Sequence, residues 1–216
     1  NLKSDKVIDA KNKIIIPGLI DSHVHFREPG LTQKEDFLTG SMAAAAGGIT
    51  TILDMPNTLP PTTNFQRLDE KRRLAKKSIV NYGFHFGSTN DNIAEIEKAK
   101  NVASVKVYMD YTTGDLIITD KNVLEKIFSL PITKAIHAEA EHIINALELA
   151  NNNSKFYFCH VSSKEDLDYI IKNKKNNVFV EVTPHHLFLT AKDLNILGSF
   201  GEMKPGLKTE KDQKAL

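Results

Sequence analysis

Short apolar runs alternate with amphipathic segments along almost the whole chain, and this alternation restricts the fold more than any other feature. The apolar runs are rich in β-branched and aromatic residues, as strands are, and lie at 14–21, 49–55, 82–86, 104–109, 135–137, 156–161 and 178–182. Segments with helical character lie at 35–47, 65–77, 92–100, 121–128, 141–151 and 164–172. This order and spacing predicts parallel strands joined by right-handed crossovers.

The alternation amounts to about six βα units, whereas a closed (β/α)8 barrel has eight. An incomplete barrel and a doubly wound open sheet fit the pattern equally well. The run that passes through Pro17-Gly18 into Leu19-Ile20-Asp21 is predicted to be a buried strand, and residues 209–216 to begin a further helix. A length of 216 residues suits one domain, or one domain with a fragment of another.

Charge and cysteine content exclude several classes of partner. The chain has 28 basic and 27 acidic residues, so we expect neither a nucleic-acid nor an anionic-membrane partner. Its apolar runs are much shorter than the roughly 20 residues of a membrane-spanning helix. The single cysteine, Cys159, excludes an internal disulfide and is typical of a reducing compartment. We therefore expect a soluble, cytoplasmic protein.

Four histidines stand at or near the carboxyl ends of predicted strands. His23 and His25 are two residues apart, so on a strand both imidazoles point to one face. His137 and His160 end two later strands. Any one of them is more often a packed or surface residue than a ligand, but a barrel brings these strand ends to one mouth. Since neutral imidazole suits zinc, the four histidines predict a metal site.

Lys106 lies inside the apolar run 104–109 and has two interpretations. In the first, its aliphatic stem lies along apolar surface and its amine reaches solvent. In the second, the amine is buried, uncharged and nucleophilic enough to take up carbon dioxide, which gives a carbamate able to bridge two metal ions. Composition does not decide between them.

Several of these stretches together resemble the dihydroorotases of the amidohydrolase superfamily. The resemblance is strongest at residues 17–30, which include Asp21-Ser22-His23-Val24-His25 and Arg27-Glu28-Pro29-Gly30, and continues at 34–36, 39–40, 43–51, 54–58, 137–139, 159–162 and 181–187. It implies an incomplete TIM barrel over residues 17–216, preceded by the end of a small flanking β domain at 1–16. It also implies zinc-dependent, reversible cyclisation of N-carbamoyl-L-aspartate to L-dihydroorotate in pyrimidine biosynthesis.

The resemblance assigns the metal ligands. It implies that His23 and His25 bind the more buried of two zinc ions, that carboxylated Lys106 bridges the pair, and that His137 and His160 hold the second ion. Many bacterial members use an aspartate near the position of Lys106, so Asp110 is the alternative ligand. The surroundings of Lys106 are more similar to hydantoinases and to the dihydroorotase domain of the animal multifunctional pyrimidine enzyme.

The resemblance also assigns substrate contacts. Arg27 and Asn57 match residues that bind the substrate carboxylate, for which a guanidinium fork is suited. Arg27 lies two residues beyond His25, on the same face if the strand continues. Lys204 matches a third contact, although the following Pro205-Gly206-Leu207-Lys208 departs from the usual Pro-Pro-Leu-Arg.

Some relatives place an extra zinc at positions that match Cys159 and Glu181. Adjacent residues on a strand face opposite ways, so Cys159 and His160 cannot both enter one site without a bend. We therefore interpret Cys159 as a small buried apolar residue.

The aspartate that serves as general acid and base in the family, in an Asp-His-Ala-Pro-like motif, does not occur in this sequence. The catalytic residue is thus unassigned, and we expect a truncated chain with little activity alone. Allantoinase or hydantoinase activity is the nearest alternative. Another is a catalytically inactive homologue with a structural role, either in a homo-oligomer or in a complex of pyrimidine enzymes.

Overall fold

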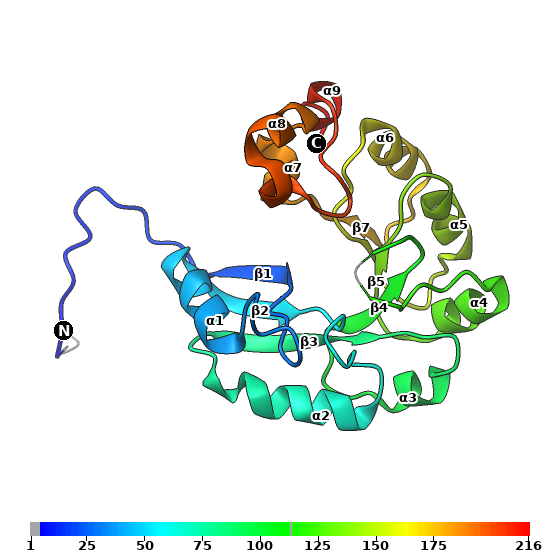
Figure 1. Cartoon of the computed structure of the whole chain (residues 1–216), viewed down its shortest axis with the longest axis horizontal. Coiled ribbons are helices and arrows are strands. Elements are labelled where there is room, and N and C mark those ends of the chain that lie inside the picture. The colour runs from blue at the N-terminus through cyan, green and yellow to red at the C-terminus, as the bar shows by residue number, and fades with distance from the viewer. Residues whose placement is uncertain (1–4, 113) are drawn as a thin grey trace.

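Seven parallel strands form one curled sheet in this computed structural model, which describes residues 5–112 and 114–216 (Figure 1). The strands pair in sequential order, β1 to β7, and every pairing is parallel. Their bounds are β1 Leu19–Val24, β2 Ile49–Asp54, β3 Asn81–Gly87, β4 Ser104–Tyr108, β5 Lys134–His137, β6 Phe156–Phe158 and β7 Val178–Val180. A doubly wound sheet reverses its strand order, and this sheet does not. The TIM-barrel prediction is confirmed.

Six helices connect the strands and lie along the outer side of the curled sheet (Figure 1). They are α1 Phe37–Ala46, α2 Phe65–Leu74, α3 Ile93–Lys98, α4 Lys121–Ser129, α5 Glu141–Leu149 and α6 Lys164–Asn173. Short helices follow β7: α7 Pro184–Phe188, α8 Leu194–Leu197 and α9 Glu210–Gln213. Three 3-10 turns lie at Ala75–Lys77, Ala191–Asp193 and Gly198–Gly201.

Side-chain caps explain where several helices begin. Ser163 accepts a hydrogen bond from Asp166 N at 3.1 Å at the start of α6, and Asn64 caps α2 in the same way. Such caps satisfy amide groups that have no partner within the helix. Thr209 and Asp212 form a reciprocal capping box at the start of α9, which agrees with the helix predicted to begin in this segment.

The main apolar core lies between the sheet and the outer helices. It includes Phe37 of α1, Ile52 of β2, Leu68 of α2 and Phe128 of α4, all with 1% exposure or less. Side chains alternate along each strand, so Val105 and Val107 of β4 join this core. Alternation therefore assigns Ser104, Lys106 and Tyr108 to the inner face of the curl.

The first strand differs from its prediction. Leu19 and Ile20 are 52% and 67% exposed, so the expectation of a buried strand was wrong for this end of β1. The reason is topological, because within the described residues β1 pairs only with β2 and forms an edge of the sheet. Residues 5–18 lie outside the strands and extend away from the body of the chain (Figure 1). Assignment of residues 1–16 to a second domain stays a prediction, and residues 1–4 lie outside the described ones.

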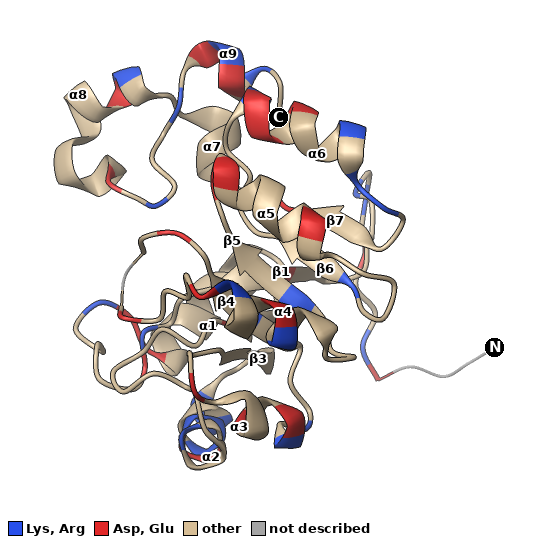
Figure 2. Cartoon of the chain, turned by 90° about the vertical axis from the view of Figure 1, so that its right-hand side faces the viewer, with Lys and Arg blue, Asp and Glu red and all other residues tan. Residues whose placement is uncertain are grey.

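Basic and acidic residues are interspersed over the helices (Figure 2). None of the helices in the described ranges has the length and apolar character needed to cross a bilayer.

Candidate metal centre and substrate cavity

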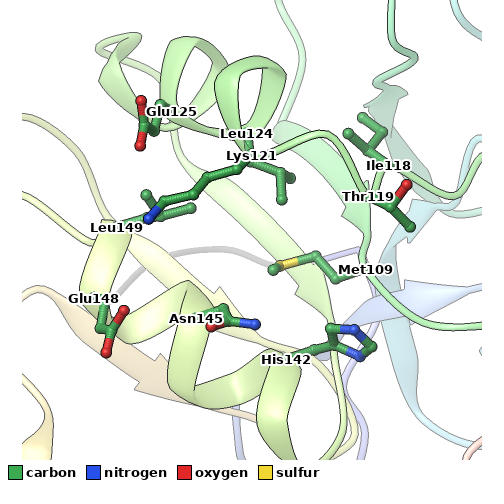
Figure 3. A pocket seen from close by; sticks show the side chains of 10 residues that line it. All are labelled: Met109, Ile118, Thr119, Lys121, Leu124, Glu125, His142, Asn145, Glu148 and Leu149. Carbon is green, nitrogen blue, oxygen red and sulfur yellow. The ribbon is translucent and has the colours of Figure 1, made fainter.

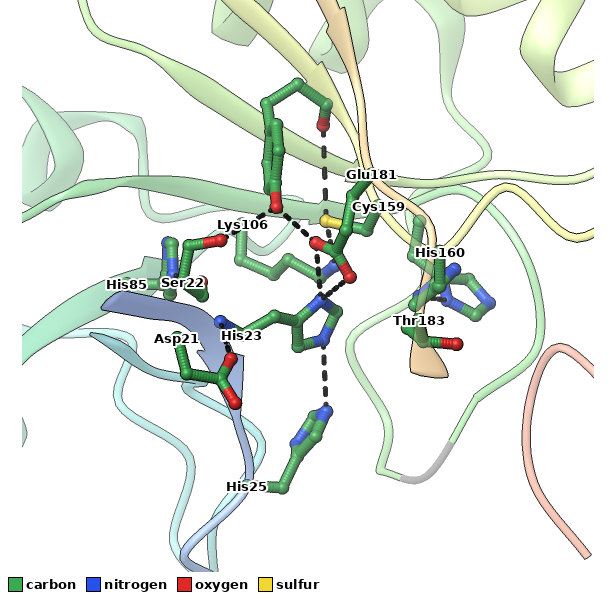
Figure 4. A network of polar contacts seen from close by, with 12 residues as sticks. Asp21, Ser22, His23, His25, His85, Lys106, Cys159, His160, Glu181 and Thr183 are labelled. Carbon is green, nitrogen blue, oxygen red and sulfur yellow. Dashed lines mark hydrogen bonds and ion pairs between the residues drawn. The ribbon is translucent and has the colours of Figure 1, made fainter. Parts of the chain in front are cut away.

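The four predicted histidine ligands come together inside the curl of the sheet. His23 belongs to β1, His25 follows that strand, His137 ends β5 and His160 follows β6. Ring centroids are 5.2 Å apart for His23 and His25, 5.2 Å for His23 and His160, and 4.6 Å for His137 and His160. Segments from the beginning and from the second half of the chain therefore contribute imidazoles to one cluster, of which Figure 4 shows His23, His25 and His160.

Hydrogen bonds fix the orientation of the first two rings. His23 Nδ1 lies 3.0 Å from Glu181 Oε1, and His25 Nδ1 lies 2.7 Å from Asn57 Oδ1. Each oxygen accepts from Nδ1–H, which leaves the lone pair of each ring on Nε2. The two Nε2 atoms are 3.2 Å apart. Zinc-binding histidines use this same outer arrangement, with one ring nitrogen held by an oxygen and the other presented to the ion.

Burial keeps all four histidines neutral. It lowers the pKa of His23, His25 and His160 well below the ordinary value and that of His137 to about 4, and the nearby Lys106 amine adds to each effect. His137 Nδ1 is 2.9 Å from His160 Nε2, while His137 Nε2 and His160 Nδ1 are buried and have no hydrogen-bond partner in the described part of the chain. Buried polar atoms are rarely left in this state. Neutral rings with unpartnered nitrogens fit a metal ion.

Lys106 is buried among these rings. Its side chain is 1% exposed and its Nζ lies 3.0 Å from Cys159 Sγ (Figure 4). The interpretation in which its amine reaches solvent was therefore wrong. Within the described residues no carboxylate lies close enough to form an ion pair with Nζ. Lys106 therefore lies in the interior of the histidine cluster, where its amine contacts the Cys159 thiol.

Asp110, the alternative ligand, is engaged elsewhere. Its Oδ2 accepts from Glu139 N at 2.7 Å and lies 2.9 Å from His142 Nδ1. It therefore supports the segment that follows His137, and Lys106 is the group that lies among the histidines.

A bend after β6 overturns the argument that kept Cys159 out of the site. The strand ends at Phe158, and His160 has a φ of 38°, so both Cys159 and His160 point inward. The ligand atoms of His23, Cys159 and Glu181 lie within 4.8 Å of one another. Burial raises the pKa of Cys159 to about 11, so its thiol is protonated near neutral pH. The family resemblance had already pointed to Cys159 and Glu181 as positions of an extra zinc. Strand alternation did not predict the bend that turns Cys159 inward.

A cavity of about 700 Å³ opens above the histidines. Its lining contains most of the predicted site residues: His23, His25, Arg27, Asn57, His160 and Lys204. Lys106 and His137 do not line it, because both are buried behind contacts with Cys159 and His160. His185 lines the cavity as well. Its neighbour His186 is buried and bonds Thr183.

Arg27 is the principal charged group of this cavity. Its Nη1 is buried and has no hydrogen-bond partner within the described ranges. On another side, Lys204 Nζ lies 3.4 Å from the centre of the Tyr111 ring. Lys34 adds a third cation to the lining and Glu202 one anion. The cavity thus has a net positive lining, with an unsatisfied guanidinium donor close to the histidine cluster.

A second, smaller pocket of about 330 Å³ lies between α4 and α5 (Figure 3). Its lining includes Met109, Lys121, Glu125 and His142. None of the predicted site residues lines it, so we do not assign it to the same site.

Comparison with known proteins finds related sequences and related folds. Residues 14–178 match the Amidohydrolase family. The dihydroorotase of Methanosarcina acetivorans is 39% identical over 99% of this chain and 55% of its own length, and the multifunctional protein CAD of Squalus acanthias is 36% identical over 96% of this chain and 10% of its own length. The L-hydantoinase (dihydropyrimidinase) from Arthrobacter aurescens has a similar fold, with a TM-score of 0.91 at 24% identity over 100% of this chain and 57% of its own.

The chain spans about half the length of the curated dihydroorotases that it matches. The family match covers most of the chain, and the matched range includes His23, His25, Lys106, His137 and His160. On this match and on the seven-stranded parallel fold, the chain belongs to the amidohydrolase family.

Proposed function

We propose that this chain carries the metal centre and much of the substrate site of a dihydroorotase, which interconverts N-carbamoyl-L-aspartate and L-dihydroorotate. The observation that carries the proposal is Arg27 beside the histidine cluster in one cavity, with its buried Nη1 lacking a hydrogen-bond partner among the described residues. The curated relatives named dihydroorotase support it.

In this proposal His23 and His25 hold one zinc ion, and His137 and His160 hold a second. Support comes from the neutral rings, from the Nε2 atoms of the first pair that face each other, and from one nitrogen on each ring of the second pair that has no hydrogen-bond partner where the structure describes the chain. Uptake of carbon dioxide by the Lys106 amine, with release of one proton, would supply an anionic group between the pairs. When bound, zinc supplies Lewis-acid polarisation of a carbonyl and activation of water.

Arg27 and Asn57 would recognise the substrate. Both dihydroorotate and N-carbamoyl-aspartate carry a carboxylate, and a guanidinium fork binds that group through two parallel hydrogen bonds. Because Arg27 Nη1 is buried and has no hydrogen-bond partner in residues 5–112 and 114–216, a carboxylate would satisfy this donor. Lys204 would add a second cation at the cavity wall. Hydantoin and allantoin have no carboxylate, so they would gain nothing from Arg27.

A binding experiment tests the proposal without requiring turnover. The zinc-loaded protein is titrated calorimetrically with L-dihydroorotate, hydantoin and allantoin. We expect dihydroorotate to bind at least about tenfold more tightly than the other two, since a charge-assisted hydrogen bond contributes roughly 1.5–3 kcal/mol. Arg27→Met should abolish that preference. Equal or tighter binding of hydantoin by the wild type would exclude dihydroorotase specificity in favour of a hydantoinase-type site.

A cytoplasmic location, and assembly with copies of itself or with other pyrimidine enzymes, complete the proposal. The name of the CAD relative supports the second part, because that protein is described as multifunctional. Size-exclusion chromatography with light scattering would measure whether the protein self-associates.

A further inference from the structure

Asp54 and Lys71 form a fully buried ion pair outside the cavity. Asp54 Oδ2 lies 2.6 Å from Lys71 Nζ, and both side chains are 0% exposed. Asp54 ends β2 and Lys71 lies in α2. Neither residue has a part in the proposed metal centre or substrate site. Because a buried ion pair adds little net stability over apolar residues of similar volume, the other contacts of these two side chains are informative.

Asp54 holds the backbone between His25 and Arg27. Its Oδ1 accepts a hydrogen bond from Phe26 N at 2.7 Å. The backbone pairing of β1 with β2 ends at Val24, whose carbonyl accepts from Met55 N at 2.9 Å. Beyond that point the Phe26 amide bonds a side-chain carboxylate in place of a strand partner. Asp54 thereby sets the directions in which His25 and Arg27 leave the sheet.

Arg27 needs such support because its φ is 62°, in the left-handed region that non-glycine residues rarely occupy. A backbone in this region persists only where the surrounding contacts hold it. The bond from Phe26 to Asp54 fixes the residue before Arg27, and Leu31 N donates to Arg27 O at 3.1 Å on the other side.

Lys71 holds the neighbouring loop. Its Nζ donates to Met55 O at 2.6 Å, and Met55 begins the turn that contains Asn57. Asn57 Oδ1 in turn lies 2.7 Å from His25 Nδ1. The links therefore form a closed circuit. Asp54 bonds Phe26, which follows His25 in the chain, and His25 bonds Asn57. Asn57 is joined through Pro56 to Met55, Met55 bonds Lys71, and Lys71 pairs with Asp54.

We propose that the Asp54–Lys71 pair is a positioning device. It fixes the positions of the His25 imidazole and the Arg27 guanidinium relative to each other. One buried pair fixes the backbone that carries both side chains and the loop that orients the His25 ring. The part of this inference that concerns dihydroorotate rests on the proposed function, whereas its structural part does not.

Two double variants test the device. Asp54→Leu with Lys71→Met removes both charges and the oxygen that accepts from Phe26 N. Asp54→Asn with Lys71→Met also removes both charges but keeps that oxygen. Neither leaves an unpaired buried charge, which is the usual cause of collapse when one partner of a buried pair is removed. Lys134→Met is the matched control, because Lys134 is another fully buried lysine and bonds Leu130 and Ser154, outside the site.

Zinc affinity is measured by competition with a chromophoric chelator, and the affinity of the zinc-loaded protein for L-dihydroorotate is measured by calorimetry. The Leu/Met variant should bind zinc about 10- to 100-fold more weakly than the wild type, as removal of groups that orient metal ligands does, and it should bind dihydroorotate more weakly as well. The Asn/Met variant should bind zinc at least about tenfold more tightly than the Leu/Met variant. Lys134→Met should change only the unfolding midpoint. Equal zinc affinities in the two double variants, or a wild-type affinity in the Leu/Met variant, would overturn the inference.

Amide hydrogen exchange supplies a test that needs neither metal nor turnover. In the wild type the Phe26 amide should exchange slowly, as an amide bonded to a buried carboxylate does. Exchange of Phe26 at the rate of an exposed amide would refute the positioning role even if the variants failed to fold. If the wild type neither binds zinc nor acts on dihydroorotate, the proposed function fails while this measurement still decides the inference.

Discussion

Lys134 gives the stability of this protein an unusual dependence on pH. The residue begins β5, its side chain is 0% exposed, and its Nζ contacts the Leu130 carbonyl, Ser154 Oγ and the face of the Phe156 ring. Within the described residues no carboxylate forms an ion pair with it. Burial lowers the pKa of Lys134 from the ordinary 10.5 to about 8.

The sign follows from proton counting. Between pH 8 and 10.5 the unfolded chain binds a proton at Lys134 that the folded chain does not bind, so the free energy of unfolding rises with pH across this window. At 1.36 kcal/mol per pH unit, the free energy of unfolding rises by about 3 kcal/mol across this interval. Below pH 8 the folded state bears the full penalty of a charged, buried amine, and above pH 10.5 that penalty is gone.

Lys134→Met isolates this contribution, because methionine has a similar length and does not titrate. Urea unfolding of both proteins at pH 7, 8, 9 and 10 gives their difference in free energy, in which contributions from other groups cancel. We expect the variant to lose about 2–3 kcal/mol relative to the wild type as the pH rises from 7 to 10. A difference that stays constant over this range would show that Lys134 does not titrate as its burial requires.

Three further predictions concern other parts of the fold. Ser163→Ala should lower the free energy of unfolding by about 1 kcal/mol in urea, since it removes the cap at the start of α6; no change would mean that the cap is replaced by water. Gly30→Ala should destabilise the protein by roughly 1–3 kcal/mol, because Gly30 has a φ of 85° and an added Cβ would lie 1.8 Å from Leu59 O; an unchanged melting temperature would contradict the loop geometry. With the proposed zinc bound, protons should not compete for His137 between pH 7 and 6, because burial lowers the pKa of this ring to about 4; complete loss of zinc by pH 6, measured by atomic absorption after dialysis, would contradict that lowered pKa.

Periodicity predicted the strands, the outer helices and their parallel order, because these depend on local patterns of apolar residues. It also predicted that His23, His25, His137 and His160 meet, since the carboxyl ends of parallel strands share one edge. The exposure of Leu19 and Ile20 was not predictable in this way, because it depends on which strand lies at an edge of the sheet.

Other features of the site arise from departures from regular geometry. The bend at His160, with its positive φ, brings Cys159 inward in a way that strict alternation forbids. The ion pair of Asp54 and Lys71 joins a strand end to a charged helix, and a lysine in such a helix would ordinarily face solvent. Both depend on tertiary contacts, which residue type and local periodicity do not encode.

The contact between His23 and Glu181 joins residues 158 positions apart, and this separation has a consequence for biosynthesis. Contacts of high sequence separation close large loops, so they form late in folding. During translation, His23 and His25 emerge from the ribosome long before Glu181, which orients the His23 ring. Any metal captured cotranslationally would meet a partial ligand set until the seventh strand has emerged, so loading of the complete centre is a step that follows synthesis of this segment.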